Sequence, residues 1–195
     1  MTTKDQAKAR ARAFSVYLGL GSNLGDREAN LSGAIERIKG LGVEIVRASS
    51  IYETEPVGYA DQPWFLNQVV EIRIAAHTTT PVNQLEELLG SLHEIEHEMG
   101  RERTIPNGPR VIDIDILLAP GMRSVEENSD GKVRRAALIV PHPRMHERRF
   151  VLEPLCEIAP DLIHPALGQT CREMLAALGD RSTIRLYKRG KHIEH

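Results

Sequence analysis

Apolar residues recur along positions 14–118 with two different periods. Alternation of apolar and polar positions predicts strands, whereas apolar residues three and four positions apart predict helices. These patterns predict a strand at 14–20, a helix from Asp26 to Gly40, strands at 43–52 and 64–76, a helix from Pro81 to Gly100, and a strand at 111–118. The order βαββαβ is typical of the ferredoxin-like α+β fold, an antiparallel sheet with helices packed on one face.

The remainder of the chain is less regular. Residues 121–135 are polar and charged, which predicts a long surface loop, and residues 136–140 could add one short strand. C-terminal helices are expected at 147–158 and 170–178. We therefore expect a disordered basic extension at 1–13, a single domain at 14–180, and a basic tail at 181–195 that frays.

Composition adds few constraints to this picture. The chain has 195 residues, is 41% hydrophobic and 27% charged, and has a formal net charge of −2, so we expect neither a nucleic-acid partner nor a membrane surface. Cys156 and Cys171 form no disulfide framework or metal-ligand spacing and are expected to be reduced thiols. The N-terminus has no apolar signal segment. The expectation is a cytoplasmic monomer.

The most informative segment is the predicted strand at 111–118, which contains Asp113 and Asp115 in an apolar, β-branched run. Side chains alternate along a strand, so the two carboxylates share one face about 7 Å apart. Their mutual repulsion calls for positive charge, and a pair of Mg²⁺ ions would supply it. The alternative is two solvated aspartates on an exposed strand face.

A glycine cluster follows the first predicted strand, with the sequence Gly19-Leu20-Gly21-Ser22-Asn23-Leu24-Gly25. It superficially resembles a dinucleotide-binding fingerprint, but Leu24 stands where the third glycine belongs. The simpler interpretation is a tight turn that requires flexible glycines.

The segment His93-Glu94-Ile95-Glu96-His97 matches the zinc-protease pattern H-E-x-x-H on the second predicted helix. The extended pattern would require a third ligand at position 103, where Arg103 cannot bind zinc. Solvated histidines on a helix surface are the simpler interpretation, and zinc hydrolysis is a distant alternative.

Two basic clusters flank the aspartates in sequence. Arg101, Arg103 and Arg110 precede the strand, and residues 141–150 contain two histidines, three arginines and Phe150. Arginine recognises phosphate oxygens, and carboxylates, Mg²⁺ and arginines together are the usual components of phosphoryl transfer. The alternatives are surface arginines paired with nearby glutamates and a solvated helix start.

Together these segments resemble one family, the 6-hydroxymethyl-7,8-dihydropterin pyrophosphokinases of folate biosynthesis. The resemblance covers residues 15–178 in the family's order. The matching motifs are Gly21-Ser22-Asn23-Leu24-Gly25, Tyr52-Glu53-Thr54-Glu55-Pro56-Val57-Gly58, Gln62-Pro63-Trp64-Phe65-Leu66-Asn67, Gly108-Pro109-Arg110 with Asp113-Ile114-Asp115, and Val140-Pro141-His142-Pro143-Arg144-Met145 with Arg148-Arg149-Phe150.

The resemblance implies a ferredoxin-like fold and transfer of the β,γ-pyrophosphoryl unit of ATP to the hydroxymethyl group of 6-hydroxymethyl-7,8-dihydropterin, which yields AMP and the pterin diphosphate. It implies that Asp113 and Asp115 bind two Mg²⁺ ions and that Arg101 and Arg110 close on the reacting phosphates as catalytic cations. The implied ATP contacts are Glu96 on the adenosine side, Arg101, Arg103, Arg110, His142 and Arg148.

The resemblance also implies a pterin site. Phe65 and Phe150 would sandwich the pterin ring. Asn67 would read the polar edge, since its amide offers both a donor and an acceptor. The implied pterin-binding residues are Thr54, Glu55, Val57, Phe65, Asn67, Asp113 and Phe150.

Three features depart from the family pattern. Pro106-Asn107 stands where many members carry Arg-Trp, Phe65 replaces a common Tyr, and the loop at 121–135 is longer than usual. Two alternatives of other classes remain open from the residues alone. One is another Mg²⁺-dependent nucleotidyl or phosphoryl transferase on the same fold, and the other is a non-catalytic ligand-binding domain.

Overall fold

The computed structural model describes residues 13–75, 80–102, 108–123 and 138–190. Within these ranges the chain forms six strands, four α-helices and one 3₁₀ helix. The strands are β1 (Ala13–Ser22), β2 (Glu44–Ala48), β3 (Ile51–Thr54), β4 (Phe65–Ala75), β5 (Asp113–Leu118) and β6 (Ile184–Lys188); the helices are α2 (Arg27–Gly40), α3 (Pro81–Glu98), η1 (Met145–Glu147), α4 (Arg149–Ile158) and α5 (Cys171–Ala177).

The strands form a single antiparallel sheet in the order β5-β1-β4-β3-β6, with β2 also paired to β4. The predicted α+β class is therefore confirmed. In the register of the sheet, Gly21 of β1 lies opposite Asp113 of β5 on one side and Asn67 of β4 on the other, and Gly19 lies opposite Asp115. The central strand thus brings the aspartates and Asn67 to one end of the sheet.

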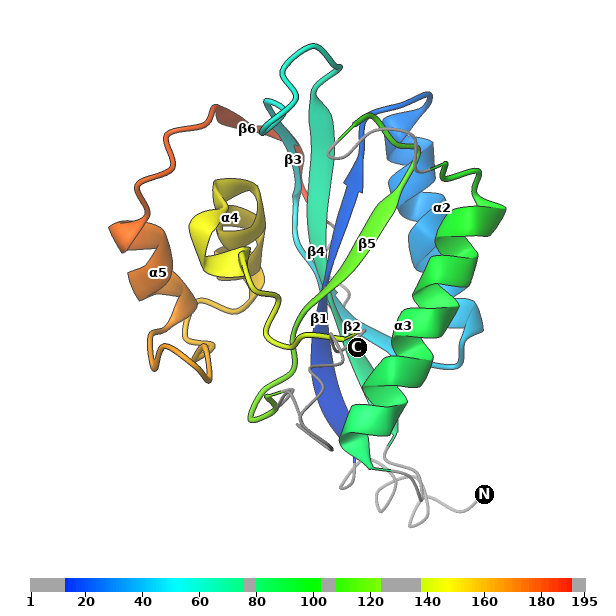
Figure 1. Ribbon diagram of the computed structural model, residues 1–195, viewed down its shortest axis with the longest axis vertical. Helices are drawn as coiled ribbons and strands as arrows, with labels where there is room; N and C mark the ends of the chain where they lie inside the picture. Colours follow the sequence, from blue (N-terminus) through cyan, green and yellow to red (C-terminus); the bar gives the residue numbers. More distant parts are fainter. Residues whose placement is uncertain (1–12, 76–79, 103–107, 124–137, 191–195) are drawn as a thin grey trace, which may run out of the picture.

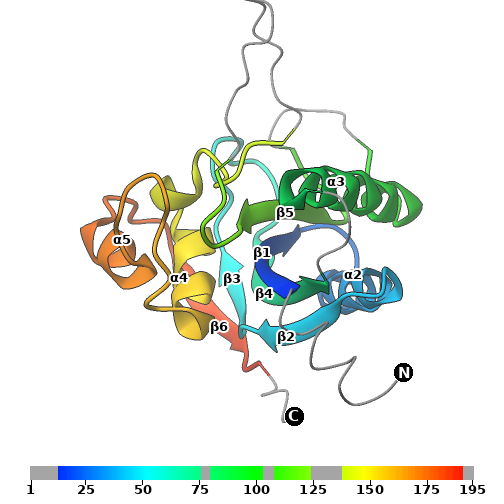
Figure 2. The same ribbon diagram turned by 90° about the horizontal axis from the view of Figure 1, so that it is seen from below.

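Helices cover both faces of the sheet (Figures 1 and 2). Val16 and Leu18 of β1 belong to the core beneath α2 and α3, whereas Tyr17 belongs to a second core beneath α4 and α5. This alternation follows from the two-residue period of a strand. The two helices of the predicted βαββαβ unit, α2 and α3, cover one face as expected, and the additional C-terminal helices α4 and α5 cover the other.

The predicted strand at 43–52 is two strands. The chain leaves β2 at Ser49, whose backbone N–H donates to the Val69 carbonyl while its hydroxyl accepts from the Val69 N–H. β2 and β3 then pair with successive parts of β4. Residues 138–140 form no strand, and residues 136–137 lie outside the described ranges.

The expectation that the tail frays is wrong for β6. This strand pairs with β3, and the Arg185 guanidinium contacts the Glu53 carboxylate at 2.7 Å. Just beyond it, the Gly190 N–H donates to the Ser50 hydroxyl at 3.0 Å. Among the described residues, no helix has the length and apolar content needed to cross a membrane.

Candidate active site

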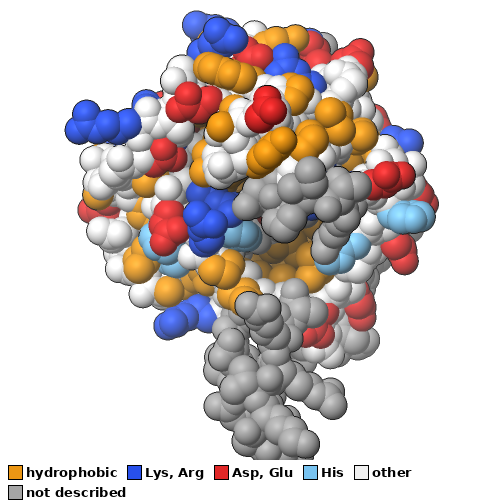
Figure 3. Space-filling view, turned by 45° about the horizontal axis from the view of Figure 1, so that its top comes forward, with side chains coloured by type: hydrophobic (Ala, Val, Ile, Leu, Met, Phe, Trp, Pro, Cys, Tyr) orange, Lys and Arg blue, Asp and Glu red, His pale blue; other side chains and the backbone are white. Residues whose placement is uncertain are grey.

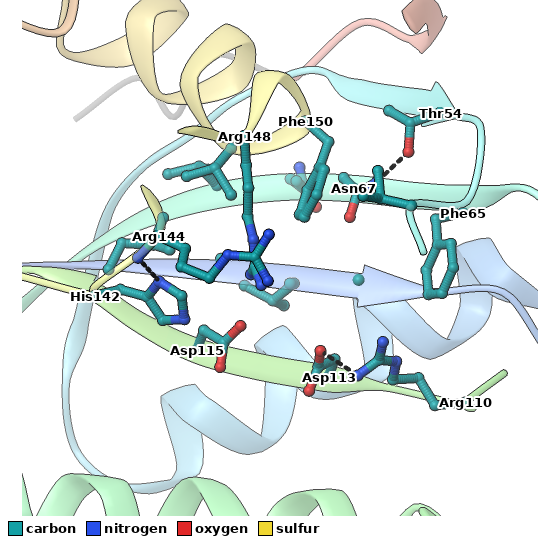
Figure 4. A pocket seen from close by; sticks show the side chains of 18 of the residues that line it. Thr54, Phe65, Asn67, Arg110, Asp113, Asp115, His142, Arg144, Arg148 and Phe150 are labelled. Atoms are coloured by element: carbon teal, nitrogen blue, oxygen red, sulfur yellow. Dashed lines mark hydrogen bonds and ion pairs between the residues drawn. The ribbon is translucent and has the colours of Figure 1, made fainter. Parts of the chain in front are cut away.

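A cavity of about 310 Å³ lies over one end of the sheet, between β5, β1 and β4 and the segments at 54–58 and 142–151 (Figure 4). On the face shown in Figure 3, basic and histidine side chains lie beside a hollow bordered by hydrophobic side chains. The sequence-predicted residues that line the cavity are Thr54, Glu55, Val57, Phe65, Asn67, Arg101, Arg110, Asp113, Asp115, His142, Arg148 and Phe150.

Asp113 and Asp115 both face the cavity from β5, as their spacing predicts (Figure 4). Asp113 contacts two guanidinium groups, Arg101 at 2.6 Å and Arg110 at 2.8 Å. The pKa of Asp115 is raised to about 6, because burial removes water from its carboxylate and because the negative charge of Asp113 lies nearby. The pair therefore favours an added cation.

The donor set fits Mg²⁺, which binds oxygen ligands and usually keeps several positions for water or substrate phosphates. Within the described ranges, no group of three or more His, Cys, Asp or Glu side chains could hold a metal ion. The two aspartates would therefore hold a cation whose other ligands come from a bound ligand or from water.

Glu96 lies outside the lining of the cavity. Its buried carboxylate accepts a hydrogen bond from the Ile114 backbone N–H at 2.7 Å and forms an ion pair with Arg101. Burial raises the pKa of Glu96. Thus Glu96 anchors the strand between the two aspartates and holds Arg101, instead of lining the cavity as an adenosine contact would. Arg103 and Pro106-Asn107 fall outside the described residues.

Basic side chains converge on the cavity from the segment at 142–148. The pKa of His142 is lowered to about 4 by burial and by the positive charge of Arg148. His142 Nδ1 accepts a hydrogen bond from the Arg144 backbone N–H at 3.2 Å, so a neutral imidazole carries its proton on Nε2. Arg144 also lines the cavity, although the sequence analysis gave this member of the 141–150 cluster no role.

The two phenylalanines each lie beneath a cation. The Arg110 guanidinium carbon lies 5.5 Å from the centre of the Phe65 ring, and that of Arg148 lies 5.6 Å from the centre of the Phe150 ring. These are cation–π contacts. The aromatic and basic parts of the cavity are therefore in direct contact.

The polar edge of the cavity is organised by Asn67 and Thr54. Asn67 Nδ2 donates to Thr54 Oγ1 at 2.7 Å (Figure 4). A Cβ at Gly21 would lie 3.0 Å from Asn67 Oδ1, so glycine at this position leaves room for the amide. The glycine cluster therefore does more than form a turn: it shapes the base of the cavity.

The segment before β6 braces the loop at 54–57. The Glu55 N–H donates to the Thr183 carbonyl at 3.3 Å, and the Thr183 N–H donates to Glu55 Oε1 at 2.7 Å. Sequence reasoning missed this role of Thr183, because no local pattern indicates a contact across more than a hundred residues.

The zinc pattern on α3 gains no support from the geometry. His93 and His97 are exposed, whereas Glu96 points inward and is buried. The described part of the chain brings no third ligand to the two histidines.

A family model described as 7,8-dihydro-6-hydroxymethylpterin-pyrophosphokinase (HPPK) matches residues 17–160. A 2-amino-4-hydroxy-6-hydroxymethyldihydropteridine pyrophosphokinase of Bacillus subtilis is 41% identical over 179 residues, which cover 91% of this chain and 93% of that protein. The protein of the same name from Methylorubrum extorquens is 45% identical over 163 residues, covering 83% of this chain and 92% of the relative.

Longer proteins also contain a matching region. The chain is 40% identical over 154 residues to the folic acid synthesis protein fol1 of Pneumocystis carinii, of which it covers 19%. A crystal structure of the HPPK-DHPS of Plasmodium falciparum superposes with a TM-score of 0.59 at 18% identity, covering 85% of this chain and 44% of that one. This structural similarity supports the fold alone.

Proposed function

The chain belongs to the 7,8-dihydro-6-hydroxymethylpterin-pyrophosphokinase family of folate biosynthesis, and we propose that its reaction takes place in the cavity over Asp113 and Asp115. Enzymes of this family use ATP and transfer its pyrophosphoryl unit to the hydroxymethyl group of the dihydropterin, which releases AMP. The observation that carries the assignment of the site is the meeting of paired carboxylates, arginines and two phenylalanines in one cavity.

Asp113 and Asp115 are the proposed ligands of two Mg²⁺ ions. When bound, Mg²⁺ neutralises phosphate charge and lowers the pKa of a coordinated hydroxyl group. Arg101 and Arg110 both form ion pairs with Asp113, so they are within reach of phosphates held at the same carboxylate. We propose that both guanidinium groups bind the reacting phosphates and stabilise their charge.

The proposed pterin site lies at the aromatic end. Phe65 and Phe150 would stack on the ring, and the guanidinium groups that cover them would turn to the phosphates. Asn67 and the backbone at 54–57 would bind the polar edge of the pterin. The hydrogen bonds that Asn67 donates to Thr54 and that Thr183 donates to Glu55 support this, because they fix these groups before substrate arrives.

The proposed nucleotide contacts are Arg144, Arg148 and His142. A depressed pKa keeps His142 neutral near pH 7, so Nε2 donates a hydrogen bond to a phosphate oxygen without adding positive charge. The guanidinium groups of Arg144 and Arg148 supply the charge.

Conversion of ATP to AMP that requires both Mg²⁺ and 6-hydroxymethyl-7,8-dihydropterin tests this proposal. Asp113→Asn and Asp115→Asn should each lower turnover by at least about 100-fold, since even residues that only support metal ligands cost 10–100-fold. Asp161→Asn is the matched control, because that aspartate is exposed and paired only with Arg172 in the described contacts. Wild-type turnover by the variant that combines Asp113→Asn with Asp115→Asn would show that these two residues are not the metal ligands.

The reaction products separate the alternatives. A nucleotidyl transferase on the same fold would release pyrophosphate and leave AMP attached to its acceptor, whereas pyrophosphoryl transfer releases free AMP. A non-catalytic ligand-binding domain would bind the nucleotide and form neither product.

We further propose that the enzyme acts as a cytoplasmic monomer. The cavity already combines carboxylates, arginines and both phenylalanines, so the proposed reaction does not call for a residue of a second copy. Sedimentation equilibrium should give a mass near 21.8 kDa; a stable dimer would contradict the monomer.

A further inference from the structure

Asn23, in the glycine cluster after β1, is 2% exposed and uses its amide fully. Its backbone N–H donates to the Arg110 carbonyl at 3.1 Å, and its Oδ1 accepts from the Arg110 N–H at 2.7 Å. Nδ2 donates to Gln62 Oε1 and to the Pro63 carbonyl, both at 3.0 Å. One side chain therefore joins the backbone of Arg110 to the loop that leads into β4.

The two segments that Asn23 connects also contact each other through their side chains at the cavity. Arg110 projects from the first connected segment and ion-pairs with Asp113. Phe65 lies two residues beyond Pro63, and its ring lies under the Arg110 guanidinium. Asn23 thus holds the backbone of Arg110 and that of Pro63, two residues before Phe65, although it does not line the cavity itself.

Only a carboxamide at this position satisfies the contacts. The Arg110 N–H requires an acceptor, whereas the Pro63 carbonyl requires a donor. An aspartate would place an acceptor against that carbonyl, and an alanine would leave buried polar groups without partners. The pairing of β1 with β5 ends at Gly21 and Asp113. The hydrogen bonds between Asn23 and the Arg110 backbone connect the two segments beyond that point.

We infer that Asn23 is a positioning residue that holds Arg110 for pyrophosphoryl transfer and fixes its distance from the pterin-side loop. This inference rests on the proposed role of Arg110. Small displacements of catalytic groups cost up to about 100-fold in rate, so Asn23→Ala should lower kcat by about 10- to 100-fold with a much smaller change in the Kd for ATP.

The matched control is Asn30→Ala. Asn30 Nδ2 donates to the Leu24 carbonyl and the Ser22 hydroxyl, so this amide stabilises the same turn without touching Arg110. Thermal unfolding should show similar losses of stability for both variants, while only Asn23→Ala loses kcat. Equal losses of kcat would mean that Asn23 merely stabilises the turn and would overturn the inference. If Asn23→Ala does not fold, Asn23→Asp tests the inference instead: it keeps the acceptor for the Arg110 N–H and loses the donor to Pro63, so it should keep kcat much closer to wild type than Arg110→Ala does, and a loss as large as that of Arg110→Ala would overturn the inference.

A double-mutant cycle with Arg110→Ala gives the decisive measurement. If Asn23 acts through Arg110, the double variant should lose less than about threefold more kcat than Arg110→Ala alone. If the losses of kcat in the two single variants multiply in the double variant, Asn23 does not act through Arg110, although the proposed role of Arg110 itself would stand. Wild-type turnover by Arg110→Ala would instead show that the proposed function of Arg110 is wrong, and the inference with it.

Discussion

At the scale of single residues, Asp113 and Asp115 differ in their neighbours although they share one strand face. Two guanidinium groups form ion pairs with Asp113, whereas Asp115 is half-buried beside it and has a raised pKa. The carboxylate of Asp115 therefore bears most of the electrostatic cost of the pair, and a cation bound there would relieve it.

The stability of Asp115→Asn should depend on pH. The raised pKa means that the folded protein binds this proton more tightly than the unfolded chain, so ligand-free wild type loses stability as pH rises from about 4 to about 6. Asp115→Asn has no carboxylate to titrate, so it does not lose this stability. Its free energy of unfolding relative to wild type should rise by about 1–3 kcal/mol between pH 4 and pH 7.5. Urea unfolding in EDTA at both pH values measures the difference, with Asp161→Asn as the control. A difference in the free energy of unfolding between the variant and wild type that does not change with pH would contradict the raised pKa of Asp115.

Sequence reasoning found most of the residues that line the cavity but not the bonds between them. The period of two correctly placed Asp113 and Asp115 on one face, because local geometry alone decides it. The link from Asn23 to Arg110 and the link from Glu96 to Ile114 are long-range contacts, which no single-sequence pattern encodes. The site could thus be predicted as a set of side chains but not as a network.

At the scale of elements, helices were predicted more accurately than strands. Asp26 accepts from the Ala29 N–H as the cap of α2, and Pro81 begins α3 as expected. β6 was missed although Ile184, Arg185 and Leu186 alternate, because the segment is short and lies in a basic stretch, and most of its side chains are exposed. It is held by backbone pairing at the sheet edge, and composition does not reveal such pairing.

Removal of β6 should impair pterin binding more than ATP binding. A chain that ends after Arg181 loses both hydrogen bonds between Thr183 and Glu55, so the loop at 54–57 loses its brace. We expect the pterin Kd to rise about tenfold, which corresponds to about 1.4 kcal/mol, while the ATP Kd changes little. Isothermal titration calorimetry measures both constants.

The control for this truncation is a chain that ends after Gly190, which keeps β6 and its contacts and should bind pterin like the full chain. Equal weakening of ATP and pterin binding by the shorter chain would point to general unfolding instead of a local brace.

At the scale of the whole molecule, two cores on opposite faces share one sheet, and the cavity lies where segments from both sides meet. Asp113 and Asp115 project from β5 to the face opposite α2 and α3, since the alternate residues Ile114 and Ile116 belong to the core beneath those helices. The segment before α4 brings the basic side chains to the same cavity. A ligand that bridges these parts should therefore stabilise the entire fold.

Mg²⁺ and ATP together should raise the midpoint of thermal unfolding. A ligand at 100 times its Kd adds about 2.7 kcal/mol, which in a domain of this size corresponds to about 5–10 °C. Differential scanning fluorimetry with ATP and Mg²⁺, and with ATP and EDTA, measures the effect. The Asp113→Ala, Asp115→Ala double variant should show no increase that depends on Mg²⁺. An equal increase in EDTA would mean that the nucleotide binds without the metal.

The brace from Thr183 to Glu55 also has a consequence for biosynthesis of the protein. β6 is the last of the described strands to leave the ribosome, whereas both aspartates and the residues of α4 emerge before it. Domains generally fold as units during translation, so the brace on the loop at 54–57 can form only once β6, which follows both aspartates and α4 in the chain, has emerged.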